Sequence, residues 1–81
     1  MIQKHPVPLP SIEQDAQCVV AVLAGGLGFQ KRLRSMGVRE GKKLRIVAKH
    51  PFAGPLVVEV DGRKITIGRG MASKIDVKLE A

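Results

Sequence analysis

Hydrophobic and polar residues change their spacing several times along the chain, and each change predicts a different element. Residues 17–24 are almost entirely apolar over the length of a strand, which is typical of a buried strand. From 27 to 36 the apolar residues instead recur every three or four positions, which predicts a short amphipathic helix. A helix of about ten residues is marginal on its own, so its apolar side must pack against the sheet.

Glycines bound this helix on both sides. Gly25 and Gly26 end the strand ahead of it, and Gly37 stands where a left-handed C-terminal cap is favoured. The apolar side of the helix consists of Phe29, Leu33 and Met36.

Beyond Gly41 the hydrophobic spacing becomes two, the period of a strand with one buried face. Alternation over 44–49, 56–60, 63–67 and 75–79 predicts four further strands. Prolines and a glycine make 50–55 a loop, which we expect to be mobile, and residues 71–74 predict one helical turn. Near the N-terminus, Ser11 is a candidate cap for a short turn over Ile12.

Asp61-Gly62 is the strongest short signal for a two-residue hairpin between the second and third of these strands. A turn of that length fixes the register of the two strands, because residues equally distant from the turn must face each other. The pairs expected are Leu56–Ile67, Val58–Ile65 and Glu59–Lys64.

These elements predict a mainly β fold: a small SH3-like barrel of about five antiparallel strands, with one short helix after the first strand. A five-stranded OB-fold is the alternative. Alternate prolines make residues 1–8 an extended N-terminal arm, and 9–81 a single domain. The last strand, 75–79, is expected to be an edge that could pair weakly with a second copy.

Charge is concentrated in one segment. The chain has 14 Lys and Arg against 7 Asp and Glu, a net charge of +7. The whole excess lies between residues 31 and 49, where eight basic residues accompany one acid. Such a patch attracts polyanions or an acidic protein surface, although net charge also serves solubility alone. The basic residues expected to matter are Lys31, Arg32, Arg34, Arg39, Lys42 and Lys43.

Residues suited to catalysis or metal binding are few and scattered. Cys18 lies within an apolar strand, and the two histidines, His5 and His50, share no metal-site spacing with it. We therefore expect no enzymatic activity, no cofactor and no metal site within one chain; a weak site between subunits stays open. A single cysteine indicates a reducing compartment, and the lack of a long apolar stretch or signal peptide indicates a cytoplasmic protein.

Binding to RNA or another nucleic acid is the main alternative function. Small basic barrels often follow phosphates, but most of them also stack bases on aromatic side chains. This chain has no Trp, no Tyr and only two Phe. Its charge therefore allows nonspecific contacts, and no specific nucleic acid is expected.

One block of the sequence resembles a known family. The block reads Gly25-Gly26-x-Gly28-(x)₃-Arg32-Leu33-(x)₂-Met36-Gly37-Val38-(x)₂-Gly41, followed by Leu44 and Ile46. It is similar to the core motif of the ferrous iron transport protein A (FeoA) family. The similarity continues through Gly54-Pro55, the Gly62 turn, and Ala72 with Ile75 and Val77, so that it covers residues 9–80. Two departures, Asp15-Ala16 and Gly54, affect turns where family members often have Pro-Gly and an acidic residue.

The resemblance implies an SH3-like barrel in the bacterial cytoplasm with a non-enzymatic accessory role. Its partner would be a membrane-embedded ferrous iron permease that carries a GTP-binding domain. Related barrels form the C-terminal domains of metal-dependent repressors, where they serve in protein contacts.

We expect the basic residues of the helix and of the segment after it to dock on the cytosolic part of such a permease and shift its conformational equilibrium. Apolar anchors would come from Leu27, Val38 or Phe52, where these are exposed. The structural positions of the motif are Gly25, Gly26, Leu33, Met36, Gly37, Gly41 and Gly62.

Overall fold

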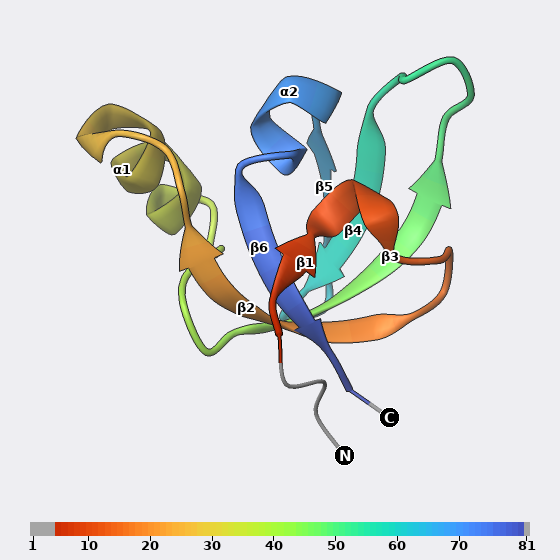
Figure 1. The fold of residues 1–81 in the computed structure, drawn as a ribbon, viewed down its shortest axis with the longest axis horizontal. Helices are drawn as coiled ribbons and strands as arrows, with labels where there is room; N and C mark the ends of the chain where they lie inside the picture. The colour runs from red at the N-terminus through yellow and green to blue at the C-terminus, as the bar shows by residue number, and fades with distance from the viewer. Residues whose placement is uncertain (1–4, 81) are drawn as a thin grey trace.

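The computed structural model describes residues 5–80, in which six strands form one strongly curved antiparallel sheet (Figure 1). The strand order is β1-β6-β2-β3-β4-β5. The strands are β1 (Val7–Pro8), β2 (Gln17–Leu23), β3 (Lys43–Lys49), β4 (Leu56–Val60), β5 (Arg63–Ile67) and β6 (Ile75–Leu79). The predicted mainly β architecture is confirmed, with β1 added to the five strands expected.

Three short helical segments connect the strands. The helix α1 (Leu27–Ser35) joins β2 to β3, as the apolar spacing predicts. The one-turn helix α2 (Arg69–Ala72) precedes β6 and begins two residues earlier than expected. A 3₁₀ turn, η1 (Leu9–Ser11), follows β1. Ser11 closes this turn rather than capping a later one, because its hydroxyl donates to the carbonyl of Pro8 at 2.7 Å.

The β4–β5 hairpin has the predicted register at every pair. Leu56 faces Ile67, and Val58 faces Ile65. The turn residue Asp61 has a φ of 51° and Gly62 a φ of 77°. Both values are positive, as a type I′ turn requires, so local turn chemistry and side-chain alternation agree here.

The core lies inside the curve of the sheet and is wholly apolar within the described residues. Register shifts between Val20 and Val22 in β2 and between Ile46 and Ala48 in β3 add to the bending of the sheet. The buried residues are Leu9, Ile12, Cys18, Val20, Leu23, Leu33, Val38, Leu44, Ile46, Leu56, Val58, Val60, Ile67, Ala72, Ile75 and Val77.

The position of the last strand corrects one prediction. The strand β6 is not an edge, because β2 pairs with one side of it while Val7 and Pro8 of β1 pair with Val77 and Asp76 on the other. The proline-rich arm is thus extended at Val7–Pro8, as expected, but it belongs to the sheet; residues 1–4 lie outside the described part. The two ends of the sheet are β1 and β5.

Candidate docking surface

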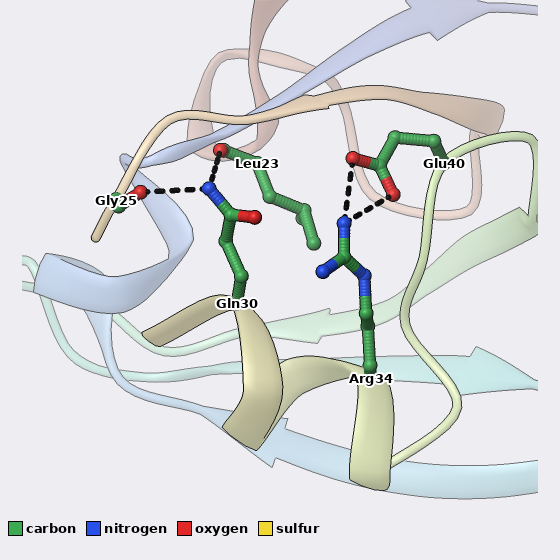
Figure 2. A network of polar contacts seen from close by, with 5 residues as sticks. All are labelled: Leu23, Gly25, Gln30, Arg34 and Glu40. Atoms are coloured by element: carbon green, nitrogen blue, oxygen red, sulfur yellow. Dashed lines mark hydrogen bonds and ion pairs between the residues drawn. The ribbon is translucent and has the colours of Figure 1, made fainter. Parts of the chain in front are cut away.

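The N-terminal half of α1 is tied to the end of β2. The side-chain amide of Gln30 donates to the carbonyl of Gly25 at 3.0 Å and to that of Leu23 at 3.4 Å (Figure 2). A Cβ at Gly25 would lie 2.3 Å from the ring of Phe29, so only glycine lets the chain pass this close to the helix.

The C-terminal end of α1 closes in a Schellman motif. The N–H of Val38 donates to the carbonyl of Leu33 at 2.9 Å, and the N–H of Gly37 to that of Arg34 at 3.0 Å. Gly37 has a φ of +90°, as the sequence predicts for a left-handed cap. The Arg63 guanidinium of β5 also donates to a carbonyl in this turn, that of Met36, at 3.3 Å.

The inner side of α1 packs on the core through the three predicted residues. Leu33 is fully buried, while Phe29 and Met36 are half-buried against the core cluster. The Lys74 ammonium lies 5.8 Å from the centre of the Phe29 ring, within range of a cation–π contact. Because both ends and the inner side are held, the outward face of α1 is fixed in orientation.

Ion pairs divide the predicted basic residues into two groups. The Arg34 guanidinium contacts both carboxylate oxygens of Glu40, the nearer at 3.1 Å (Figure 2). Lys42 and Lys43 also pair with acidic residues, Asp61 at 2.8 Å and Glu80 at 3.5 Å respectively. Lys31, Arg32 and Arg39 are exposed and form no ion pair within residues 5–80.

Hydrogen bonds to the Glu40 carboxylate favour its ionised form. A hydrogen bond from its own backbone N–H, followed by that from Arg34, holds the pKa of the Glu40 carboxyl below its usual range. Glu40 is therefore ionised at neutral pH and cancels the charge of Arg34 locally.

The three predicted apolar anchors lie in three different surroundings. Leu27 is 76% exposed at the start of α1, and Phe52 is 100% exposed at the tip of the β3–β4 loop. Val38 is fully buried, which removes it from any contact surface. Helix α1 and the β3–β4 loop stand on opposite sides of the molecule (Figure 1), so Leu27 and Phe52 belong to separate surfaces.

A residue that sequence reasoning did not single out fastens the β3–β4 loop. The Arg69 side chain donates to the carbonyls of Gly54 at 3.0 Å and His50 at 3.2 Å. At the loop tip Phe52 and Ala53 have φ values of 59° and 58°, which non-glycine residues seldom adopt. The loop expected to be mobile is thus held at its base by α2.

Side chains that could bind a metal ion are dispersed. Among residues 5–80, no three His, Cys, Asp or Glu side chains come together in a way that could hold a metal ion. Burial, followed by the charge of Glu80, raises the pKa of the Cys18 thiol to about 11. His5 and His50 are both exposed. None of the helices in this part of the chain is long and apolar enough to cross a membrane.

Comparison with known proteins supplies a family. The FeoA domain matches residues 7–79. A protein of Methanocaldococcus jannaschii named as an Fe(2+) transport protein A is 35% identical over 71 residues, which cover 88% of this chain and 84% of that protein.

Two solved structures are similar across almost the whole chain. The crystal structure of an iron uptake regulatory protein (FeoA) is 29% identical with a TM-score of 0.85, covering 99% of this chain and 100% of the other. The apo form of the manganese-activated repressor ScaR is 22% identical with a TM-score of 0.81, covering 89% of this chain and 34% of the repressor, and shows a shared fold. These likenesses confirm the SH3-like prediction.

Proposed function

The chain belongs to the FeoA domain family, and on this basis we propose that it is a non-enzymatic accessory protein of ferrous iron uptake. Its action would be to bind the cytosolic part of a membrane permease that carries a GTP-binding domain. The ferrous ion is the cargo of that permease. The observation that carries the proposal is a rigidly held helix, α1, whose outward face combines exposed positive charge with an exposed apolar side chain.

The contact face that we propose consists of Leu27, Lys31 and Arg32, and we call it the α1 face. Leu27 and Lys31 are four residues apart and so lie on the same side of the helix. Leu27 supplies the apolar anchor that interfaces need near their centre, and the two unpaired charges supply attraction to an acidic surface. Arg39, exposed shortly after the helix, extends the positive surface.

The paired basic residues have a smaller role in this proposal. Arg34, Lys42 and Lys43 are each within 3.5 Å of a carboxylate, so their charge is largely cancelled at short range. An acidic partner would have to displace those carboxylates to gain from them. Binding should therefore depend on Lys31 and Arg32 more than on the other basic residues.

Charge reversal tests the α1 face. We expect Lys31→Glu to weaken binding to the isolated cytosolic domain of the permease by about tenfold, or about 1.4 kcal/mol. Lys78→Glu on β6 changes the net charge by the same amount and serves as the matched control, with less than about a twofold effect expected. Isothermal titration calorimetry at two salt concentrations measures the affinity of both variants. The loss of affinity in Lys31→Glu should be smaller at high salt.

The results separate this proposal from the nucleic-acid alternative. Equal binding by wild type and the Lys31→Glu variant would reject the α1 face. Failure of the wild type to bind the permease domain, together with saturable binding to RNA, would favour nucleic-acid binding instead. That alternative has one fully exposed aromatic side chain in its support, Phe52, among the described residues.

A further inference from the structure

The free edge of β5 offers unpaired backbone groups. This strand lies at one end of the sheet and pairs only with β4. In an antiparallel pair with a two-residue turn, alternate residues direct both backbone polar groups toward the neighbouring strand. Val60–Arg63 flanks the turn, so the backbone groups of Lys64 and Thr66 point away from β4. Within residues 5–80 they form no backbone hydrogen bond to any loop or turn.

Apolar and polar side chains of β5 point to opposite faces of the sheet. Ile65 and Ile67 turn toward the core, where they face Val58 and Leu56, while Lys64 and Thr66 are exposed on the outer side. A strand added to this edge would alternate in the same way. Its residue opposite Lys64 would lie on the outer face, and its residue opposite Ile65 would lie against the core side.

The charge of β5 determines what kind of strand the edge would accept. Arg63 and Lys64 are exposed, and neither forms an ion pair in the described part of the chain. The strand itself contains no acidic residue, and Glu59, which faces Lys64 from β4, is already bound by Arg45 at 3.3 Å. Basic residues on an open edge oppose pairing between two copies, since each copy would bring the same positive charge to the interface. Opposite charges directly across two strands stabilise pairing instead.

We propose that β5 is a peptide-binding edge that takes an extended acidic segment of another protein as a seventh strand. Main-chain hydrogen bonds to Lys64 and Thr66 provide the attachment. Carboxylates opposite Lys64 and beside Arg63 provide selection for an acidic sequence. This surface is distinct from the α1 face and requires no iron permease.

Hydrogen exchange tests the edge directly. The probe is a short synthetic peptide that alternates Glu with Val and has blocked ends; a peptide that alternates Lys with Val is the charge control. With the Glu–Val peptide at millimolar concentration, exchange of the amides of Lys64 and Thr66 should slow by about tenfold or more. The Lys–Val peptide should leave both rates unchanged.

Two results would overturn the inference. One is unchanged exchange at both amides with the Glu–Val peptide. The other is a response confined to α1, which would mean that the peptide acts as a simple polyanion. A response at the β5 amides alone would support the edge whether or not the permease domain binds α1, so the two proposals fail independently.

A backbone variant provides a second measurement. Thr66→Pro removes an N–H that points to solvent, so the β4–β5 ladder is retained, as edge strands allow. It should weaken peptide binding by about tenfold, whereas Thr66→Ala, which keeps the N–H, should bind like the wild type. Equal binding by the two variants would contradict strand addition. The exchange measurement on the wild type stands if the proline variant fails to fold.

Discussion

Replacing Leu33 with alanine should destabilise the domain, whereas the same replacement at Leu27 in the same helix should leave its stability almost unchanged. Leu33 is fully buried, and Leu27 is 76% exposed. Leu33 is also the one fully buried residue of α1, so among the residues of the helix its truncation should weaken packing on the core most directly. Both substitutions replace a leucine with alanine in the same helix, so the two variants differ mainly in how deeply the replaced side chain is buried.

The expected size of the effect follows from burial. Truncating a buried leucine to alanine costs about 2–5 kcal/mol, because transfer energy is lost and a cavity remains. In a domain of this length each kcal/mol lowers Tm by about 4–8 °C, so Leu33→Ala should lower Tm by roughly 8 °C at the least. Leu27→Ala should change stability by less than about 0.5 kcal/mol, as exposed substitutions usually do.

Urea unfolding followed by circular dichroism measures both variants. The chain has no Trp and no Tyr, so it lacks the usual fluorescence probes of unfolding. The slope of the free energy of unfolding against urea concentration should be the same in the wild type and both variants. An equal slope means that the unfolding reaction itself is unchanged. A loss below about 1 kcal/mol for Leu33→Ala, or similar losses for the two variants, would refute the assignment of Leu33 as the anchor of α1.

Leu27 should matter for binding rather than for stability. Leu27→Ala removes the apolar anchor of the α1 face and should weaken binding to the permease domain by at least about fivefold without loss of fold. Normal affinity in Leu27→Ala would leave α1 as a structural element and remove its apolar contact from the proposed function.

Three further predictions follow from individual residues. Gly37→Ala should cost about 1–2 kcal/mol in urea unfolding, because Gly37 has a φ of +90°; unchanged stability would contradict the left-handed cap. The pKa of the Cys18 thiol is raised from 9.0 to about 11 by burial and by Glu80, so the folded protein keeps a proton that the unfolded chain releases. Stability should therefore fall as the pH rises from 9.0 to about 11, and the difference between wild type and Cys18→Ala across urea melts should show this slope. Arg34→Ala should raise the pKa of Glu40 only part of the way to its ordinary value, since the hydrogen bond from the backbone N–H, the largest single cause of the shift, is kept; a carboxyl NMR titration measures the change.

Local rules in the sequence account for much of the fold. The β4–β5 register follows from Asp61-Gly62 and from alternation over a few residues, with no information from the rest of the chain. The burial of Val38 could also have been predicted. In a Schellman motif the residue after the glycine contacts the helix one turn earlier, and here Val38 and Leu33 are both fully buried.

Long-range pairing accounts for the parts that could not be predicted. Strand β1 has two residues, one of them Pro8, and such a short segment carries no periodicity. Proline is tolerated there because β1 is an edge strand. That short pairing moves β6 inside the sheet and leaves β5 as the long open edge. No residue within β5 itself signals this outcome.

The pairing of charges also depends on contacts between residues that are distant in the sequence, and it affects the proposed function. The segment 31–49 carries the net charge of the sequence. Lys42 and Lys43 are nevertheless neutralised by Asp61 and Glu80, which lie far along the chain. Folding therefore cancels much of the positive charge between α1 and β3. Both proposed contact elements, α1 and β5, keep unpaired positive charge, and Arg63 links them by its hydrogen bond to the end of α1 at 3.3 Å. Because close pairing weakens the attraction of Arg34, Lys42 and Lys43 for other acids, an acidic partner should gain more from these two elements than from those paired residues.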